Sequence, residues 1–233
     1  MKILIVNGSP RGTRGATFGV VEYFMKGAKE AGASVDVLHL TQYKINHCTG
    51  CFSCWTNTPG KCIHKDDVEN LFPRLDVDLL VLATPVYVDG MTGLMKNFLD
   101  RLIPLSSGKV EIVNGHSRHP SRYGKKHGER KLALISVSGF PELDNFDPLV
   151  KHVEAVAKNM QSEFVGAILR PNAWIIPHML ERNAPVEDII EAVVQSGKDI
   201  VQHGEFDRNT LNIISREIMP AEKVAELISQ GFQ

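Results

Sequence analysis

Four cysteines lie within fifteen residues, and the 233-residue sequence contains no others. Cys48, Cys51 and Cys54 follow a C-x2-C-x2-C spacing, and Cys62 comes after seven further residues. At this spacing three thiolates can wrap one face of a metal cluster while a flexible arm brings the fourth, and a 4Fe-4S cluster requires four. In a reducing compartment, clustered cysteines more often ligate metal or carry redox chemistry than form structural disulfides.

The cysteine spacing leaves two other interpretations open. Zinc also binds four thiolates, although it more often binds them as well-separated pairs. Alternatively, the thiols hold no metal and serve loop packing or redox exchange, with Cys51 and Cys54 as the reactive dithiol.

A second candidate site is the turn "NGSPRGTRGAT", from Asn7 to Thr17, between an apolar strand and a helix. At such a turn the backbone N–H groups and the helix dipole bind an anion well. Ser9 and Thr17 offer hydroxyls, and Arg11 offers a fork of donors. The glycines at positions 8, 12 and 15 match neither the P-loop nor the GxGxxG fingerprint, and the next strand ends without an acid to hold a ribose. The turn therefore predicts a phosphate monoester rather than a pyrophosphate.

Two further stretches, "TPVYVDG" at 84–90 and "SVSGFPE" at 136–142, follow the ends of predicted strands. Pro85 can end its strand, and the N–H groups after it can point at the edge of a flat heteroaromatic ring. Gly139 allows close backbone approach. Neighbouring parallel strands place such loops together at the topological switch point, where doubly wound sheets bind their ligands.

Three motifs occur in order along the chain: "GSPR" after the first strand, "C..C..C.......C...DD" after the second and "PVYVDGMTGLMKNFLDR" after the third. Together they resemble the NADPH-dependent FMN reductase family of flavodoxin-like proteins, and the cysteine spacing resembles its iron-sulfur flavoprotein branch. The resemblance covers about residues 1–140. It implies noncovalent FMN and an oxidoreductase that passes electrons from NAD(P)H, or from an iron-sulfur partner, to a quinone, a flavin or another acceptor.

The resemblance also implies roles for particular residues. Those implied to hold the FMN phosphate are Ser9, Arg11, Ala16 and Thr17. Those expected to line the isoalloxazine ring are Pro85, Val86, Tyr87 and Val88, and, by the same geometry at the next strand end, Ser138, Gly139 and Phe140. Tyr87 is the candidate for shaping the face that meets the acceptor. The implied ligands of a 4Fe-4S cluster are Cys48, Cys51, Cys54 and Cys62.

Apolar runs alternate with helical stretches from the first residue onwards. This pattern predicts an α/β fold, namely a flavodoxin-like, three-layer, doubly wound, five-stranded parallel sheet with extra C-terminal helices. Strands are expected at 2–8, 34–40, 77–85, 130–139 and 163–170. Helices are expected at 16–31, 66–71, 93–103, 147–160, 185–204 and again from 207.

The length suits one main core. We expect a flavodoxin-like FMN-binding domain over 1–204, with a cysteine loop at 41–66 and a basic loop at 105–130 inserted, followed by a helical extension at 205–233. The extra helices either pack on a neighbouring subunit, as in a homodimer or homotetramer, or cover their own core.

The basic loop contains ten Lys, Arg or His residues from Lys109 to Lys131, against two glutamates. One interpretation is a solvent-exposed surface loop without a specific function. The other is a lid or subunit contact that attracts an anionic reductant, such as the 2′-phosphate of NADPH. The candidate residues are Arg118, Arg122, Lys125 and Lys126.

The formal net charge of −1 gives no general reason to expect nucleic acid or an anionic membrane as partner. No stretch approaches the roughly 18 apolar residues of a membrane span, and "MKILIVNG" lacks the long apolar region of a signal peptide. We therefore expect a cytoplasmic protein whose partner is a small-molecule electron acceptor or a redox protein. The alternatives are a non-catalytic electron carrier or thiol redox sensor, and a cluster-free NAD(P)H:acceptor reductase.

Overall fold

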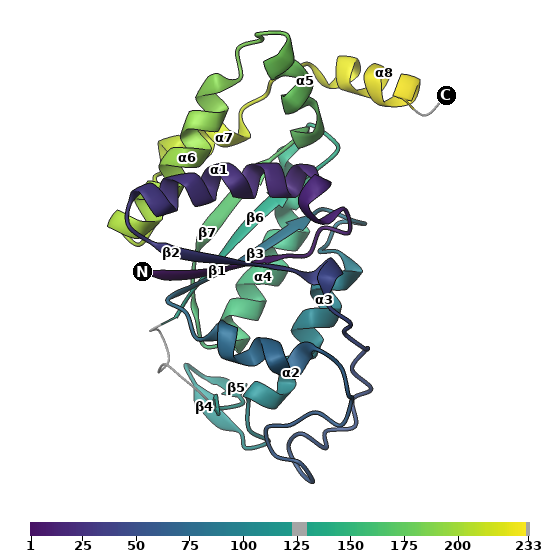
Figure 1. The fold of residues 1–233 in the computed structure, drawn as a ribbon, viewed down its shortest axis with the longest axis vertical. Coiled ribbons are helices and arrows are strands. Elements are labelled where there is room, and N and C mark those ends of the chain that lie inside the picture. The colour runs from purple at the N-terminus through teal and green to yellow at the C-terminus, as the bar shows by residue number, and fades with distance from the viewer. Residues whose placement is uncertain (123–129, 232–233) are drawn as a thin grey trace.

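The computed structural model describes residues 1–122 and 130–231, which form a layered α/β fold (Figure 1). Five parallel strands make the central sheet, in the order β2-β1-β3-β6-β7. Their bounds are Lys2–Asn7 (β1), Ser34–His39 (β2), Leu79–Pro85 (β3), Lys131–Val137 (β6) and Glu163–Arg170 (β7). This is the flavodoxin-like strand order, so the predicted fold class is confirmed.

Burial along the strands follows their position in the sheet. The three central strands β1, β3 and β6 are buried along nearly their whole length, because helices cover both faces. Strand β2 lies at the edge and alternates between exposed and more buried positions. The unbroken apolar runs of the central strands are what made them readable from the sequence.

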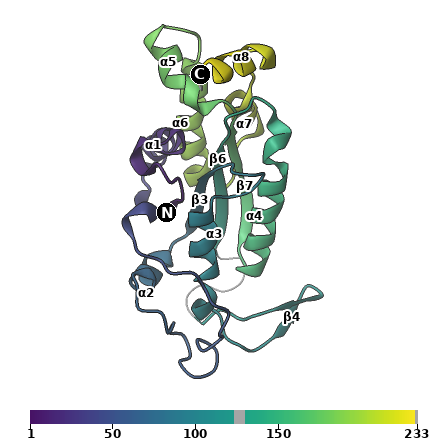
Figure 2. The ribbon, with the colours of Figure 1, turned by 90° about the vertical axis from the view of Figure 1, so that its right-hand side faces the viewer.

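Two helical layers sandwich the sheet (Figures 1 and 2). On one face, Ile3 and Ile5 of β1 belong to a core that includes α1 (Ala16–Glu30), α6 (Glu187–Gln202) and α7 (Arg208–Ser215). On the other face, Leu4 and Val6 join α2 (Val68–Leu71), α3 (Gly93–Asp100) and α4 (Asp147–Asn159). Successive residues of one strand therefore serve opposite cores, as the pleat requires.

Helix α6 packs on α1 of its own chain at two glycines. A Cβ added at Gly27 would overlap the carbonyl oxygen of Val194, and one added at Gly197 would overlap the carbonyl oxygen of Phe24. The helix backbones can approach this closely only without side chains at the crossing. The structure therefore supports coverage of their own core for α6, and also for α7, whose Ile214 lies in the same core.

Several segments differ from the expected elements. Helix α3 ends at Asp100 rather than at residue 103, and a 3-10 turn over Ile103–Leu105, with Pro104 near its start, follows it. The basic loop contains a hairpin, β4 (Glu111–Val113) and β5 (His116–Arg118), that turns at Asn-Gly with φ of 50° and 79°. Asn-Gly is a strong hairpin signal that our reading of the sequence missed.

The C-terminal part adds two short helices, α5 (Ile176–Glu181) before α6 and α8 (Ala221–Gly231) after α7. Ile214 of α7 lies in the same core as α1. The division into a domain that ends at residue 204 and a helical extension stays a prediction. Within the described residues, none of the helices is both long enough and apolar enough to cross a membrane.

The crossing of α1 and α6 gives a stability prediction. Gly27→Ala should lower the free energy of unfolding by about 2 kcal/mol or more, because the new methyl group meets backbone that cannot move aside. Gly19→Ala in the same helix is the control, since nothing lies within 4 Å of its added Cβ. The control should raise stability by about 0.5–1 kcal/mol. Urea denaturation measures both, and equal effects would contradict the close crossing.

Candidate functional site

A cavity of about 510 Å³ lies at the carboxyl ends of β1, β3 and β6. Ten of the eleven residues predicted to contact FMN line it: Ser9, Arg11, Ala16, Thr17, Pro85, Val86, Tyr87, Ser138, Gly139 and Phe140. The structure thus brings three loops that are far apart in the sequence around one space. Six further residues complete the lining: Gly15, Val137, Trp174, Leu227, Ile228 and Gly231. That the ten residues contact FMN stays a prediction.

One end of the cavity is the N-terminus of α1. Gly15 caps this helix without a side chain, and the first turn carries no acidic residue. The N–H groups of Ala16 and Thr17 have no partner within the helix, because a helix leaves its first N–H groups unsatisfied. Together with the helix dipole they make an anion-binding end. A Cβ at Gly15 would lie 2.6 Å from Ser9 Oγ, so glycine is required for the Ser9 hydroxyl to lie there.

The phosphate-binding turn is held in shape by Asn7, the last residue of β1. Its side-chain oxygen accepts a hydrogen bond from the backbone N–H of Ser9 at 3.0 Å. Its amide nitrogen donates to the carbonyl oxygen of Gly12 and lies 3.1 Å from Nδ1 of His39. Burial lowers the pKa of His39, which favours the neutral ring that can accept this hydrogen bond. Asn7 was not among the predicted site residues, although a polar residue at the end of an apolar strand is a visible signal in the sequence.

A buried hydrogen-bond network ties the ends of the three strands together. The Thr92 hydroxyl donates to the carbonyl oxygen of Gly8 at 2.6 Å, and the Thr92 N–H donates to the Thr84 hydroxyl at 3.1 Å. The Ser136 hydroxyl donates to the carbonyl oxygen of Thr84 at 2.7 Å. Satisfied buried networks of this kind are rigid, so the three loops are positioned before any ligand binds.

The loop after β3 is a two-residue turn. The N–H of Tyr87 donates to the carbonyl of Gly90, and that of Gly90 donates to the carbonyl of Tyr87. Val88 and Asp89 between them have φ of 46° and 59°, as a type I′ turn requires. The turn leaves Val88 99% exposed and outside the lining of the cavity, and a contact between Val88 and the ring stays a prediction.

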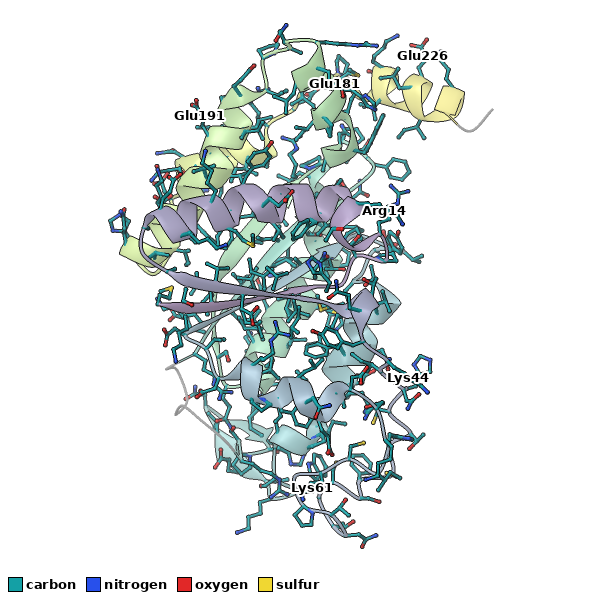
Figure 3. All side chains as sticks on the ribbon, viewed as in Figure 1. Arg14, Lys44, Lys61, Glu181, Glu191 and Glu226 are labelled. Carbon is teal, nitrogen blue, oxygen red and sulfur yellow. The ribbon has the colours of Figure 1, made fainter. Side chains whose placement is uncertain are left out.

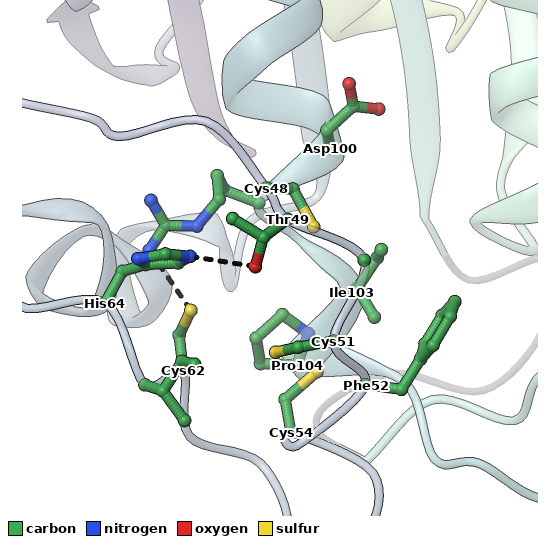
Figure 4. Close-up of a pocket in the computed structure, with 13 residues that line it drawn as sticks. Cys48, Thr49, Cys51, Phe52, Cys54, Cys62, His64, Asp100, Ile103 and Pro104 are labelled. Carbon is green, nitrogen blue, oxygen red and sulfur yellow. Dashed lines mark hydrogen bonds between the residues drawn. The ribbon is translucent and has the colours of Figure 1, made fainter.

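All four cysteines line a second pocket, which shares no residue with the first (Figure 4). Cys48 and Cys51 are exposed, Cys62 is half-buried and Cys54 is buried. Among the described residues, no three His, Cys, Asp or Glu side chains lie close enough to bind one metal ion. The number and type of donors nevertheless match a 4Fe-4S cluster, which bonds each thiolate to a different iron.

A buried ion pair anchors both ends of the cysteine loop. Arg101 donates from Nη1 and Nη2 to the two carboxylate oxygens of Asp66, at 2.6 and 3.1 Å, and both side chains are at most 1% exposed. Arg101 also donates to the carbonyl of Asn46 at 2.7 Å and to Sγ of Cys62 at 3.3 Å. Burial alone would raise the pKa of Asp66, but hydrogen bonds from Arg101 and from the Asn46 N–H outweigh it and lower that pKa.

The thiols differ in character. Hydrogen bonds from the backbone and side chain of Ser53 lower the pKa of Cys51, which is exposed. Burial raises the pKa of Cys54, and the nearby Cys62 adds to this shift. Without metal, Cys51 is therefore the more reactive thiol of this pair.

The basic loop packs against the cysteine loop. The ring of His119 lies 4.2 Å from that of Trp55, whose Nε1 donates to the carbonyl of Ile103 at 3.2 Å. Arg118 and Arg122 are not among the residues that line the first cavity. The other two candidates, Lys125 and Lys126, lie outside the described residues. A contact between this loop and NADPH stays a prediction.

The two pockets lie toward different ends of the molecule. In Figure 3, Arg14 marks the start of α1 beside the cavity, whereas Lys61 of the cysteine loop lies at the far end. Each pocket is braced by its own hydrogen bonds.

Comparison with known proteins agrees with the geometry. The family model of NADPH-dependent FMN reductases matches residues 1–141, so the chain belongs to this family, and the resemblance seen in the motifs is confirmed. An iron-sulfur flavoprotein of Archaeoglobus fulgidus is 30% identical over 138 residues, which are 59% of this chain and 66% of that protein. An iron-sulfur flavoprotein of Methanocaldococcus jannaschii is 31% identical, over 64% of this chain and 75% of that protein. The aligned regions thus span about two thirds to three quarters of these relatives.

Solved structures share the fold. An FMN-dependent NADH-azoreductase from Bacillus anthracis, solved in complex with FMN, superposes with a TM-score of 0.62 at 15% identity, covering 86% of this chain and 99% of that one. An NAD(P)H:quinone oxidoreductase from Methanothermobacter marburgensis gives a TM-score of 0.57 at 15% identity, covering 87% and 98%. At these identities the likeness concerns the fold.

The buried ion pair gives a second stability prediction. Arg101→Met should lower the free energy of unfolding by about 3–5 kcal/mol, because it leaves the Asp66 carboxylate buried without its cation. Lys96→Ala, which removes the exposed Lys96–Asp100 pair on the same helix, is the control and should change stability by less than about 0.5 kcal/mol. Chemical denaturation at neutral pH measures both. A loss for Arg101→Met no larger than the control's would show that the pair does not anchor the loop.

Proposed function

We propose that this protein is an FMN-dependent oxidoreductase that takes electrons from NAD(P)H, or from an iron-sulfur partner, and passes them to a quinone, a flavin or another acceptor. The observation that carries the proposal is the cavity at the strand ends. It combines a helix N-terminus suited to a phosphate with two loops suited to the faces of a flat ring. Bound FMN would supply the redox chemistry, while the chain binds and orients it.

The residues divide between the two ends of the ligand. In our proposal the hydroxyls of Ser9 and Thr17, the Arg11 guanidinium and the N–H groups of Ala16 and Thr17 hold the phosphate. Both hydroxyl residues are nearly buried, at 3% and 1% exposure, so their hydrogen bonds would be shielded from water. The residues proposed to flank the ring are Pro85, Val86, Tyr87, Ser138, Gly139 and Phe140. Tyr87, which is 48% exposed, is placed to shape the face that meets the acceptor.

We propose further that Cys48, Cys51, Cys54 and Cys62 hold a 4Fe-4S cluster. The names of the relatives, iron-sulfur flavoproteins, support this proposal, as does the gathering of all four thiols around one pocket. A thiol redox sensor is the competing function, and the contrast between the exposed Cys51, with its lowered pKa, and the buried Cys54 favours it as second candidate. A cluster-free NAD(P)H:acceptor reductase differs from the main proposal only at this pocket.

We also propose a cytoplasmic homodimer or homotetramer. Large apolar side chains are exposed around the cavity mouth, and a second copy could cover them: Tyr87, Val88, Phe140 and Leu143, at 48%, 99%, 60% and 46% exposure. Light scattering after gel filtration reports the subunit number.

The phosphate placement predicts the effect of two substitutions. Ser9→Ala and Thr17→Ala should each weaken FMN binding by about 1 kcal/mol, or roughly fivefold in Kd, through loss of one hydrogen bond. Thr13→Ala is the matched control, because Thr13 lies in the same turn but is exposed and does not line the cavity. Quenching of flavin fluorescence measures the three values of Kd. If all three variants bind FMN as tightly as the parent chain, the phosphate lies elsewhere.

Redox function and metal content are tested together on protein purified without oxygen. We expect flavin absorption bands, iron and acid-labile sulfide in a ratio that fits one 4Fe-4S cluster, and steady NAD(P)H consumption with a quinone. Cys62→Ser should lose iron and sulfide but keep flavin, because the two pockets share no residue.

The other outcomes separate the alternatives. Flavin without iron, with turnover, would show a cluster-free reductase. Reduction by ferredoxin-like donors alone, without NAD(P)H turnover, would show an electron carrier. Zinc in place of iron would show a structural metal site.

A further inference from the structure

The last described helix, α8, borders the cavity, although in the sequence it lies far beyond the region that matches the family model. Leu227, Ile228 and Gly231 of α8 are among the lining residues. The match to the family ends at residue 141, so neither α8 nor Trp174 belongs to it. Figures 1 and 2 show α8 at the same end of the molecule as α5, beyond the strand ends.

Helix α8 presents one apolar face to the protein. Val224, Leu227 and Ile228 have the i, i+3, i+4 spacing that places them on one side of a helix. Val224 is 1% exposed, whereas Leu227 and Ile228 are half-buried where they face the cavity. The opposite side is polar: Lys223 pairs with Glu226 at 2.6 Å, and Glu226 lies on the outer side in Figure 3. The orientation of α8 is therefore set by its own sequence.

The wall shared with α8 is aromatic. Trp174 lines the cavity, and its Nε1 donates to the carbonyl of Gly139 at 3.0 Å, which ties the indole to the loop after β6. Phe140 of the same loop is 60% exposed and also lines a second hollow, together with Val224 and Ile228. Phe140 of the loop after β6 and Trp174 thus line the cavity together with α8.

The lining of the cavity carries little charge. Among the described lining residues, Arg11 at the phosphate end is the only one with a charged side chain. The end formed by Phe140, Trp174, Leu227 and Ile228 is neutral and apolar. Such a compartment favours a flat, uncharged ring and leaves a small hydrophilic anion without contacts.

We propose that α8 and Trp174 form the acceptor compartment of the site, and that this compartment selects flat, uncharged quinones. The inference rests on the proposed function, because the proposed function places FMN in the part of the cavity that the acceptor compartment leaves free. In the overall reaction, NAD(P)H, the quinone and one proton give NAD(P)⁺ and the hydroquinone. FMN would carry the two electrons from the donor to the quinone. Leu227 and Ile228 act by contact with the acceptor and do not touch the phosphate.

The test compares two acceptors on the full-length holoprotein. Leu227→Ala/Ile228→Ala should raise KM for the naphthoquinone menadione by about tenfold, through lost apolar contacts. Turnover with ferricyanide, a small anion that accepts electrons at an exposed flavin edge, and the Kd for FMN should both stay within about twofold. Gln230→Ala, on the exposed side of the same helix, is the matched control and should leave both acceptors unchanged.

A chain that ends at Met219, and so retains every element from β1 to α7, checks that the result does not depend on a misfolded α8. It should show the same selective loss of menadione turnover. Unchanged KM for menadione in both variants, or equal losses with menadione and ferricyanide, would overturn the inference and leave the proposed function intact. A parent protein that binds no FMN, or turns over neither acceptor, would overturn the proposed function and the inference with it.

Discussion

The cavity at the strand ends depends on the topological switch point of the sheet, which lies between β1 and β3. Strands β1 and β3 are neighbours, but the helix after β1 covers one face and the helix after β3 covers the other. Their connecting loops therefore part at the carboxyl ends, and the first turn of α1 is left facing open space. The first turn of α1 has neither an acidic residue nor a capping side chain, so its N–H groups are available to bind an anion.

The two pockets are built by different physical means. The cavity is positioned by neutral hydrogen bonds, with Asn7 shaping the turn and Thr84, Thr92 and Ser136 joining the strand ends. The cysteine loop is anchored instead by a buried charge pair at its base, with hydrogen bonds from Arg101 and Trp55 beside it. A flavin site can therefore keep its shape whatever occupies the thiols.

Much of the fold and most of the cavity could be read from the sequence, because buried parallel strands leave continuous apolar runs and their ends must meet. The position of Val88 outside the cavity could not be read from "YVDG", because side-chain direction in a turn depends on the backbone φ of two residues. Trp174, Leu227 and Ile228 were missed for a different reason: only tertiary packing brings a C-terminal helix beside the loop after β6. The anchoring of the cysteine loop by Arg101 was hidden in the same way, since 35 residues separate the two partners.

The central claim is that the turn at the start of α1 binds a phosphate monoester. Its most direct test is a calorimetric comparison of FMN with riboflavin, which has the same ring and no phosphate. Two or more charge-assisted hydrogen bonds to the phosphate predict that FMN binds at least about a hundredfold more tightly. Equal affinity for the two flavins would contradict the account, because the phosphate would then contribute nothing at the site built to receive it.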